Sequence, residues 1–121
     1  MDLVRKPGED ACLSVTAEII PHFRPTIWEK DILDRLVAHA RPVRVTGHLF
    51  FDSPHKPCES TTKRASPPRI SLWEIHPVYS IEVCQNETLN TCPAKEESKW
   101  VSLDQWLTEH ASEEDTEDNH E

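Results

Sequence analysis

The segment Ile70–Cys84 is the longest extended run in the chain, and it constrains the fold more than any other stretch. Its side chains alternate between two faces, a pattern that is typical of a β-strand. Because proline cannot donate to a β-ladder, Pro77 predicts two strand halves joined by a kink or bulge, or an edge position. The row expected to face the core consists of Trp73, Ile75, Tyr79, Ile81 and Val83. The row expected to face solvent consists of Leu72, Glu74, His76, Val78 and Glu82.

Two further segments alternate in the same way. Cys12–Ile20 and Val43–Asp52 are each predicted to form a half-buried strand. Within the second segment, Gly47 indicates a bulge or a sharp bend. In the first strand, the side chains expected to face the core are Leu13, Val15, Ala17 and Ile19, and those expected to face solvent are Ser14, Thr16 and Glu18. In the second strand, the expected core-facing side chains are Val43, Val45, Leu49 and Phe51.

Two segments have helical spacing. Thr26–Ala40 repeats apolar residues every three or four positions, and Thr26 forms a capping box with the glutamate three positions later. This pattern predicts a helix that begins at Thr26. Trp100–Leu107 contains a second capping box, formed by Ser102 and Gln105, and predicts a short closing helix.

The length of 121 residues predicts a single domain. Residues 1–11 are mostly polar and are predicted to be a flexible lead-in, and residues 12–107 hold all the patterned segments. The net charge is −9, and residues 108–121 contribute seven acidic side chains and no lysine or arginine. A stretch of this kind cannot bury enough apolar surface to fold, so a disordered acidic tail is predicted.

The cellular compartment is constrained by targeting signals and by cysteines. No apolar run approaches the roughly 20 residues that a membrane-spanning helix needs, and residues 1–10 lack the apolar centre of a signal peptide. The chain as written is therefore predicted to be cytoplasmic, with no membrane partner; an incomplete N-terminus would instead fit a secreted or periplasmic protein. Cys84 and Cys92 flank a short polar loop, which fits either a disulfide or two free thiols.

The predicted order is strand, helix, strand, strand and short helix, which indicates a β-rich α+β fold. A five-stranded OB barrel contains this order, with its helix between the third and fourth strands. No segment before residue 12 qualifies as the first two strands, so the sequence predicts a partial OB-like barrel. Three strands leave two edges unpaired, where a protein partner or a second copy would bind. A truncated product and a small open sheet are the alternatives.

Three motifs resemble an uncharacterised group of bacterial OB-like proteins that are similar to staphylococcal nuclease. The motifs are Thr46-Gly47, then Asp52 with His55 in a D-x-x-H pattern, and then Trp73–Pro77, which reads W-E-I-H-P. The resemblance covers residues 12–107 and implies an OB-like fold. This chain lacks the earlier β-hairpin region with Asp and His residues that the resemblance implies.

A cluster of polar residues predicts a site for a divalent metal. If Asp52 lies opposite Ile70 in an antiparallel hairpin, His48 lies opposite Glu74, within about 5.5 Å between Cβ atoms. Two imidazoles and a carboxylate at that range can hold a metal ion, or can pair a base with its orienting carboxylate. The candidate ligands are His48, Glu74 and His76, with Asp52 and His55 at the mouth of the loop. The alternative is an ordinary solvated strand face.

The loop 53–69 carries four cations and predicts a contact with nucleic acid. In OB folds, the loop between strands four and five helps to hold oligonucleotides, and cations there contact phosphates. The candidate residues are Lys56, Lys63, Arg64 and Arg69. An aromatic stacking platform should accompany them, and Phe50 is the aromatic that the alternation places nearby. The alternative is a soluble loop with no ligand.

The sequence favours a non-enzymatic OB-like binding or interaction module. The alternative is a metal-assisted phosphodiester hydrolase, or a degenerate relative of one. A third interpretation is a fragment that does not fold alone. No nucleophile elbow and no glycine-rich phosphate loop occurs in the sequence.

Overall fold

The computed structural model describes residues 1–20 and 30–110. The capping box at residues 26–29 and most of the expected acidic tail lie outside this part of the chain. The chain forms two compact units. The first unit combines Met1–Ala40 with Val45–Ser80, and the second combines Arg41–Arg44 with the chain from Ile81 onward.

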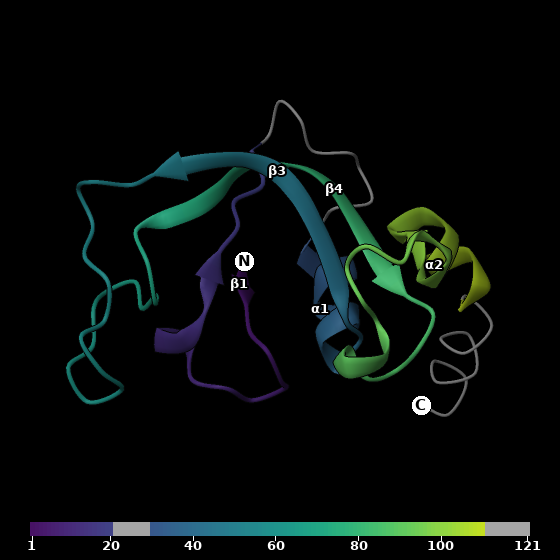
Figure 1. Cartoon of the computed structure of the whole chain (residues 1–121), viewed down its shortest axis with the longest axis horizontal. Coiled ribbons are helices and arrows are strands. Elements are labelled where there is room, and N and C mark those ends of the chain that lie inside the picture. The colour runs from purple at the N-terminus through teal and green to yellow at the C-terminus, as the bar shows by residue number, and fades with distance from the viewer. Residues whose placement is uncertain (21–29, 111–121) are drawn as a thin grey trace. The chain divides into compact units, whose positions relative to one another are not determined.

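Figure 1 shows the helices and strands in chain order. The first unit begins with β1 and β2, and α1 follows; strands β3 and β4 each pass through both units; β5 and α2 belong to the second unit. The bounds are β1 Asp2–Leu3, β2 Val15–Thr16, α1 Lys30–Ala38, β3 Val43–Phe51, β4 Trp73–Cys84, β5 Trp100–Ser102 and α2 Leu103–Glu109. Short 3-10 turns span Ala11–Leu13, Leu89–Thr91 and Glu97–Lys99.

The strands form two sheets. Strands β1 and β2 pair antiparallel, so part of the expected lead-in is a strand. The other sheet has the order β3-β4-β5, with β4 in the centre. The prediction of a β-rich α+β fold is confirmed, and the sheets of the described residues do not close into a barrel. The expected edge position for Ile70–Cys84 is wrong, because β4 is a continuous strand with a neighbour on each side.

The segment after β2 is held against β4 by backbone hydrogen bonds. Ala17 forms a parallel bridge with Ile75. The Glu18 N–H donates to the Ile75 carbonyl oxygen over 2.8 Å, and the Val78 N–H donates to the Glu18 carbonyl oxygen over 2.9 Å. Pro77 has no N–H, so the next donor along β4 is Val78. Two bonds of this kind fix Glu18 beside the strand.

The burial of residues 13–16 is opposite to the prediction, whereas Ala17 is buried and Glu18 is exposed, as predicted. Ser14 and Thr16 are buried, whereas Leu13 and Val15 are exposed. Ser14 tolerates burial because its hydroxyl donates to the Ala11 carbonyl oxygen, while its own carbonyl oxygen accepts from the Ile70 N–H. Hydrogen bonding in the first unit therefore outweighs the apolar preference that the alternation indicates.

The first half of β4 is inverted in the same way. Trp73 keeps 50% of its surface exposed and Tyr79 is also exposed, whereas Glu74 and Val78 are buried. The prediction of Trp73 as a core residue and of Glu74 as a solvent-facing residue is therefore wrong. The physical reason is that Glu74 finds a buried cationic partner, which removes the penalty of burying its charge. The second half of β4 buries Ile81, Val83 and Cys84, and for Ile81 and Val83 this is as predicted.

The second unit has a small core of its own. Cys84, Cys92 and Trp100 form one buried cluster, and Leu103 and Trp106 of α2 are buried as well. The predicted N-cap of α2 is confirmed, because the Ser102 hydroxyl oxygen accepts from the Gln105 N–H over 3.1 Å. The described helices include none with the length and apolar character needed to cross a membrane.

Each unit contains one disulfide. Cys12 is bonded to Cys58 in the first unit, and Cys84 is bonded to Cys92 in the second. Of the two alternatives left open for Cys84 and Cys92, the structure has the disulfide.

Candidate functional site

A connected set of charged side chains lies in the first unit. Arg69 is buried, and its Nη1 donates to Glu74 Oε2 and to Asp52 Oδ2, each over 3.1 Å. The same Oδ2 of Asp52 also contacts the His55 Nδ1. Glu74 Oε1 lies 3.1 Å from the His76 Nδ1. The buried guanidinium therefore fixes two carboxylates, and each carboxylate contacts one histidine.

Glu18 joins this set from the segment after β2. Its Oε2 lies 3.5 Å from the His76 Nδ1, so that imidazole faces two carboxylates. The candidate ligand atoms of Glu18, Glu74 and His76 all lie within 4.8 Å of one another. The sequence placed Glu18 on a solvated face, and no spacing in the chain connects it with Glu74. A backbone bridge between Ala17 and Ile75 is the reason that they meet.

The register of β3 against β4 differs from the prediction, and this changes the position of His48. The Asp52 N–H donates to the Leu72 carbonyl oxygen over 2.9 Å, two residues away from the expected partner Ile70. The same two-residue shift moves His48 from a position opposite Glu74 to one opposite His76. His48 is exposed on β3 and is not part of the Glu18, Glu74 and His76 group. Asp52 is connected to this group by Arg69, and His55 contacts Asp52.

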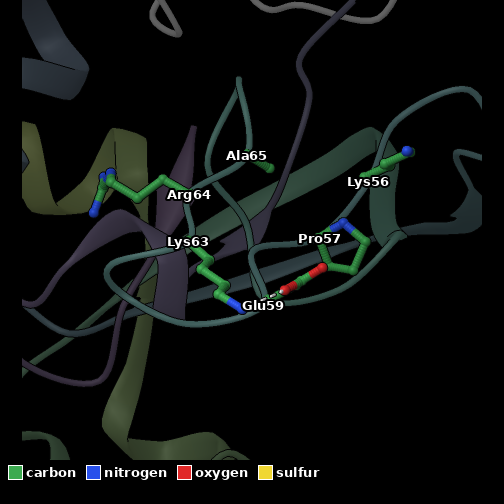
Figure 2. Close-up of a pocket in the computed structure, with 6 residues that line it drawn as sticks. All are labelled: Lys56, Pro57, Glu59, Lys63, Arg64 and Ala65. Atoms are coloured by element: carbon green, nitrogen blue, oxygen red, sulfur yellow. Dashed lines mark ion pairs between the residues drawn. The ribbon is translucent and has the colours of Figure 1, made fainter.

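Most of the loop cations that were expected to contact nucleic acid are paired with carboxylates. Arg69 is buried between Asp52 and Glu74, and Arg64 Nη1 lies 2.7 Å from Asp10 Oδ1. Lys63 Nζ lies 3.7 Å from Glu59 Oε2, an ion pair drawn in Figure 2. The remaining cation, Lys56, lines an open depression of about 320 Å³ together with Pro57, Glu59, Lys63, Arg64 and Ala65. The loop therefore offers phosphates much less free positive charge than its composition suggests.

Asp10 connects this loop to the N-terminal turn. One of its oxygens accepts from the Cys12 N–H over 2.8 Å at the start of the first 3-10 turn, and both accept from Arg64. The hydrogen bond from Cys12 and then the Arg64 guanidinium hold the pKa of Asp10 below its usual range. Asp10 lies two residues before Cys12, so this contact supports the Cys12–Cys58 disulfide.

An apolar surface lies on the strands of the first unit. The rings of Phe51 on β3 and Trp73 on β4 have their centroids 5.0 Å apart, and both are about half exposed. Leu49 on β3 is 63% exposed, and Tyr79 on β4 is exposed as well. We call Leu49, Phe51, Trp73 and Tyr79 the open face. The alternation predicts all four side chains in the core, and for these four residues that prediction is wrong.

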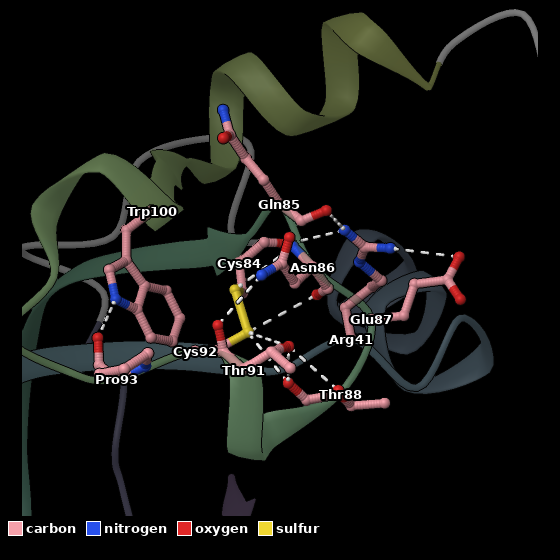
Figure 3. The surroundings of a disulfide bond; sticks show 10 residues. All are labelled: Arg41, Cys84, Gln85, Asn86, Glu87, Thr88, Thr91, Cys92, Pro93 and Trp100. Carbon is pink, nitrogen blue, oxygen red and sulfur yellow. Dashed lines mark hydrogen bonds and ion pairs between the residues drawn. A yellow bond between two sulfur atoms is a disulfide. The ribbon is translucent and has the colours of Figure 1, made fainter.

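In the second unit, the charged groups have structural roles. Arg44 donates to Glu82 and Glu97 and lies 5.2 Å from the centre of the Trp100 ring. The hydrogen bonds that Arg44 donates to Glu82 and Glu97 raise the pKa of Arg44, and they lower the pKa of Glu97. Figure 3 shows the nearby Cys84–Cys92 disulfide, with the Trp100 Nε1 donating to the Pro93 carbonyl oxygen over 3.0 Å. Arg41 donates to the carbonyl oxygens of Cys84 and Gln85.

Comparisons with known proteins found no matching family model, no matching curated protein and no matching solved structure.

Proposed function

We propose that this chain is a non-enzymatic interaction module that binds an extended, uncharged segment of another protein along β3. The observation that carries this proposal is the open face. Leu49, Phe51, Trp73 and Tyr79 keep large apolar side chains in contact with water. Phe51 and Trp73 lie against each other, and large apolar side chains exposed together in this way mark protein-interaction sites.

The edge of β3 suggests how the partner binds. In the described part of the chain, β3 has β4 as its neighbour and no strand on its other side. An edge strand presents unpaired N–H and C=O groups, to which an extended peptide can add as a further strand. From Val45 to Phe51 the strand has no acidic residue, lysine or arginine, so it lacks the charges that usually protect an edge. A partner segment with apolar residues at alternate positions would cover Leu49 and Phe51.

The expected OB-like barrel fits this proposal. We propose that the sheet is an incomplete OB-like arrangement, and that the added strand takes the place of one that this chain does not supply. The resemblance to nuclease-like OB proteins supports the same view, since it does not extend to the earlier hairpin region of those proteins. The two disulfides support function in an oxidising compartment, in place of the expected cytoplasmic location.

The alternative, a metal-assisted phosphodiester hydrolase, needs cations to hold a phosphate beside the metal. Arg69, Arg64 and Lys63 are each paired with carboxylates, which favours the interaction module over the hydrolase. Nucleic-acid binding through the same loop is disfavoured for the same reason.

The test is selection of random displayed peptides on the full-length chain. We expect the enriched peptides to carry apolar residues at alternate positions and to lose binding to the Leu49→Lys and Phe51→Lys variants. Val37→Lys is the matched control, because Val37 is an exposed apolar residue on α1. Enriched peptides without alternation, or equal binding to all variants, would contradict the proposal. A concentration-dependent dimer that Leu49→Lys abolishes would show that a second copy occupies the face instead.

A further inference from the structure

We propose that Glu18, Glu74 and His76 form a binding site for a divalent transition-metal ion, for which Zn²⁺ is the probe. This inference does not depend on the proposed interaction function. It rests on the distances between the candidate ligands, on the groups that hold them in place, and on the charge around them.

The two distances from His76 fit one shared ion, and the ligand atoms of Glu18 and Glu74 lie within 4.8 Å of each other. Ligands about 2.1 Å from a tetrahedral metal lie about 3.4 Å from each other. The His76 Nδ1 lies 3.1 Å from Glu74 Oε1 and 3.5 Å from Glu18 Oε2. An imidazole Nδ1 carries at most one hydrogen, so it donates to one of these carboxylates at a time when it is neutral. A metal ion would satisfy all three ligand atoms together.

The ligands are held in place by a second layer of contacts. Glu74 is buried, and its other oxygen accepts from Arg69, which is itself anchored by Asp52. Metal-binding carboxylates are commonly oriented by such outer hydrogen bonds. Glu18 is positioned by its two backbone hydrogen bonds to Ile75 and Val78 on β4.

The local charge favours a cation. This network contains three carboxylates and one guanidinium, those of Glu18, Asp52, Glu74 and Arg69. With neutral imidazoles the carboxylates exceed the cation by two charges, which a divalent ion balances.

The ligand types indicate the class of metal. Imidazole nitrogen suits Zn²⁺ and its transition-metal neighbours, whereas Mg²⁺ and Ca²⁺ prefer oxygen ligands alone. Three protein ligands leave one tetrahedral position for water or for a group from a partner. The side chains of His76 and Glu18 are 30% and 46% exposed, so an ion can enter from solvent.

The test is calorimetric titration of the metal-depleted full-length chain with Zn²⁺, under non-reducing conditions that keep the disulfides intact. We expect one saturable site, with affinity lowered at least about 10-fold by Glu18→Gln and by His76→Gln. These two side chains are partly exposed, so the variants should keep the fold, which circular dichroism checks. His110→Gln is the matched control, since His110 follows α2 in the second unit, away from the proposed ligands in the chain.

Two further measurements complete the test. Ca²⁺ is expected to bind much more weakly than Zn²⁺, and Zn²⁺ is expected to raise the thermal midpoint of the native chain but not that of His76→Gln. The proposal is overturned if Zn²⁺ shows no saturable binding, or if His110→Gln weakens binding as much as His76→Gln does. It is also overturned if Glu18→Gln and His76→Gln fold normally and bind Zn²⁺ as tightly as the native chain. Loss of peptide binding on the open face would leave this result unchanged, so the two proposals fail separately.

Discussion

Arg69 Nη1 lies 3.1 Å from Glu74 Oε2, and both side chains are almost completely removed from solvent. Burying a carboxylate without a partner costs free energy, and the contact with Arg69 offsets this cost for Glu74. It also decides which face of β4 turns inward in the first unit.

Replacing Arg69 with methionine should therefore destabilise the protein strongly. We expect a loss of about 3–5 kcal/mol in the free energy of unfolding, because Glu74 and Asp52 lose their shared partner. Urea denaturation in the presence of a chelator measures the change. Arg64→Met is the control, and because its pair with Asp10 is partly exposed to solvent, this variant should lose much less stability than Arg69→Met. The double variant Arg69→Met with Glu74→Met should lose less than Arg69→Met alone; an equal or larger loss would argue against this account.

The two disulfides should contribute unequally. Cys12 and Cys58 are separated by 46 residues, and Cys84 and Cys92 by 8. In the chain-entropy treatment, closing the longer loop stabilises by about 4 kcal/mol and the shorter by about 2.5 kcal/mol. Denaturation of the Cys12→Ala/Cys58→Ala and Cys84→Ala/Cys92→Ala variants compares them. A greater loss from the short loop would show that packing of Cys84 against Trp100 outweighs loop entropy.

Asp10 should make the free energy of unfolding depend on pH in the acidic range. Its pKa is lowered in the folded chain by the Cys12 N–H and by Arg64, so its contribution is complete above the usual aspartate range. The contribution is lost as the pH falls through the lowered pKa. Unfolding measured from about pH 7 to about pH 2 should show this for the native chain and a weaker dependence for Asp10→Asn. Asn still caps the turn, so Asp10→Ala should be less stable than Asp10→Asn at neutral pH. Identical acid dependence in Asp10→Asn and the native chain would contradict the assignment.

Gly47 should not tolerate a side chain. A Cβ at this position would meet the Pro77 carbonyl oxygen and would lie 2.5 Å from the Ile75 Cγ2. The backbone oxygen cannot move away freely, so Gly47→Ala should cost at least about 1–3 kcal/mol. Thermal unfolding measures it against Gly8→Ala, where a Cβ meets nothing within 4 Å but the positive φ of 77° adds modest strain. A smaller loss at Gly47 than at Gly8 would rule out the close approach.

Helix caps and extended segments could be predicted from the sequence, but the face of each strand that is buried could not. The Ser102 cap of α2 depends on residues three positions apart, so its prediction needed no tertiary information. The same is true of the extended conformation of β3 and β4. Which row of β4 is buried depends instead on Arg69, a loop residue whose partner cannot be identified from alternation. Counting apolar side chains therefore assigned Trp73 to the core and Glu74 to solvent.

The candidate metal site shows the same division. Glu74 and His76 share a face at a spacing of two, and this part follows from strand geometry. Glu18 enters through a parallel bridge between distant segments, which local pattern does not encode. The prediction that His48 lies opposite Glu74 is wrong, because the hydrogen bond of Asp52 to Leu72 shifts the register by two residues.

The division of the chain into two units has a consequence for how this fold can be inherited. The exchange points fall inside β3, between Arg44 and Val45, and inside β4, between Ser80 and Ile81. Neither unit is therefore a contiguous stretch of chain. A recombination event that copies one uninterrupted DNA segment cannot move either unit without carrying pieces of the other. The pair must pass between genes together, and a protease that cuts the chain once cannot release either unit whole.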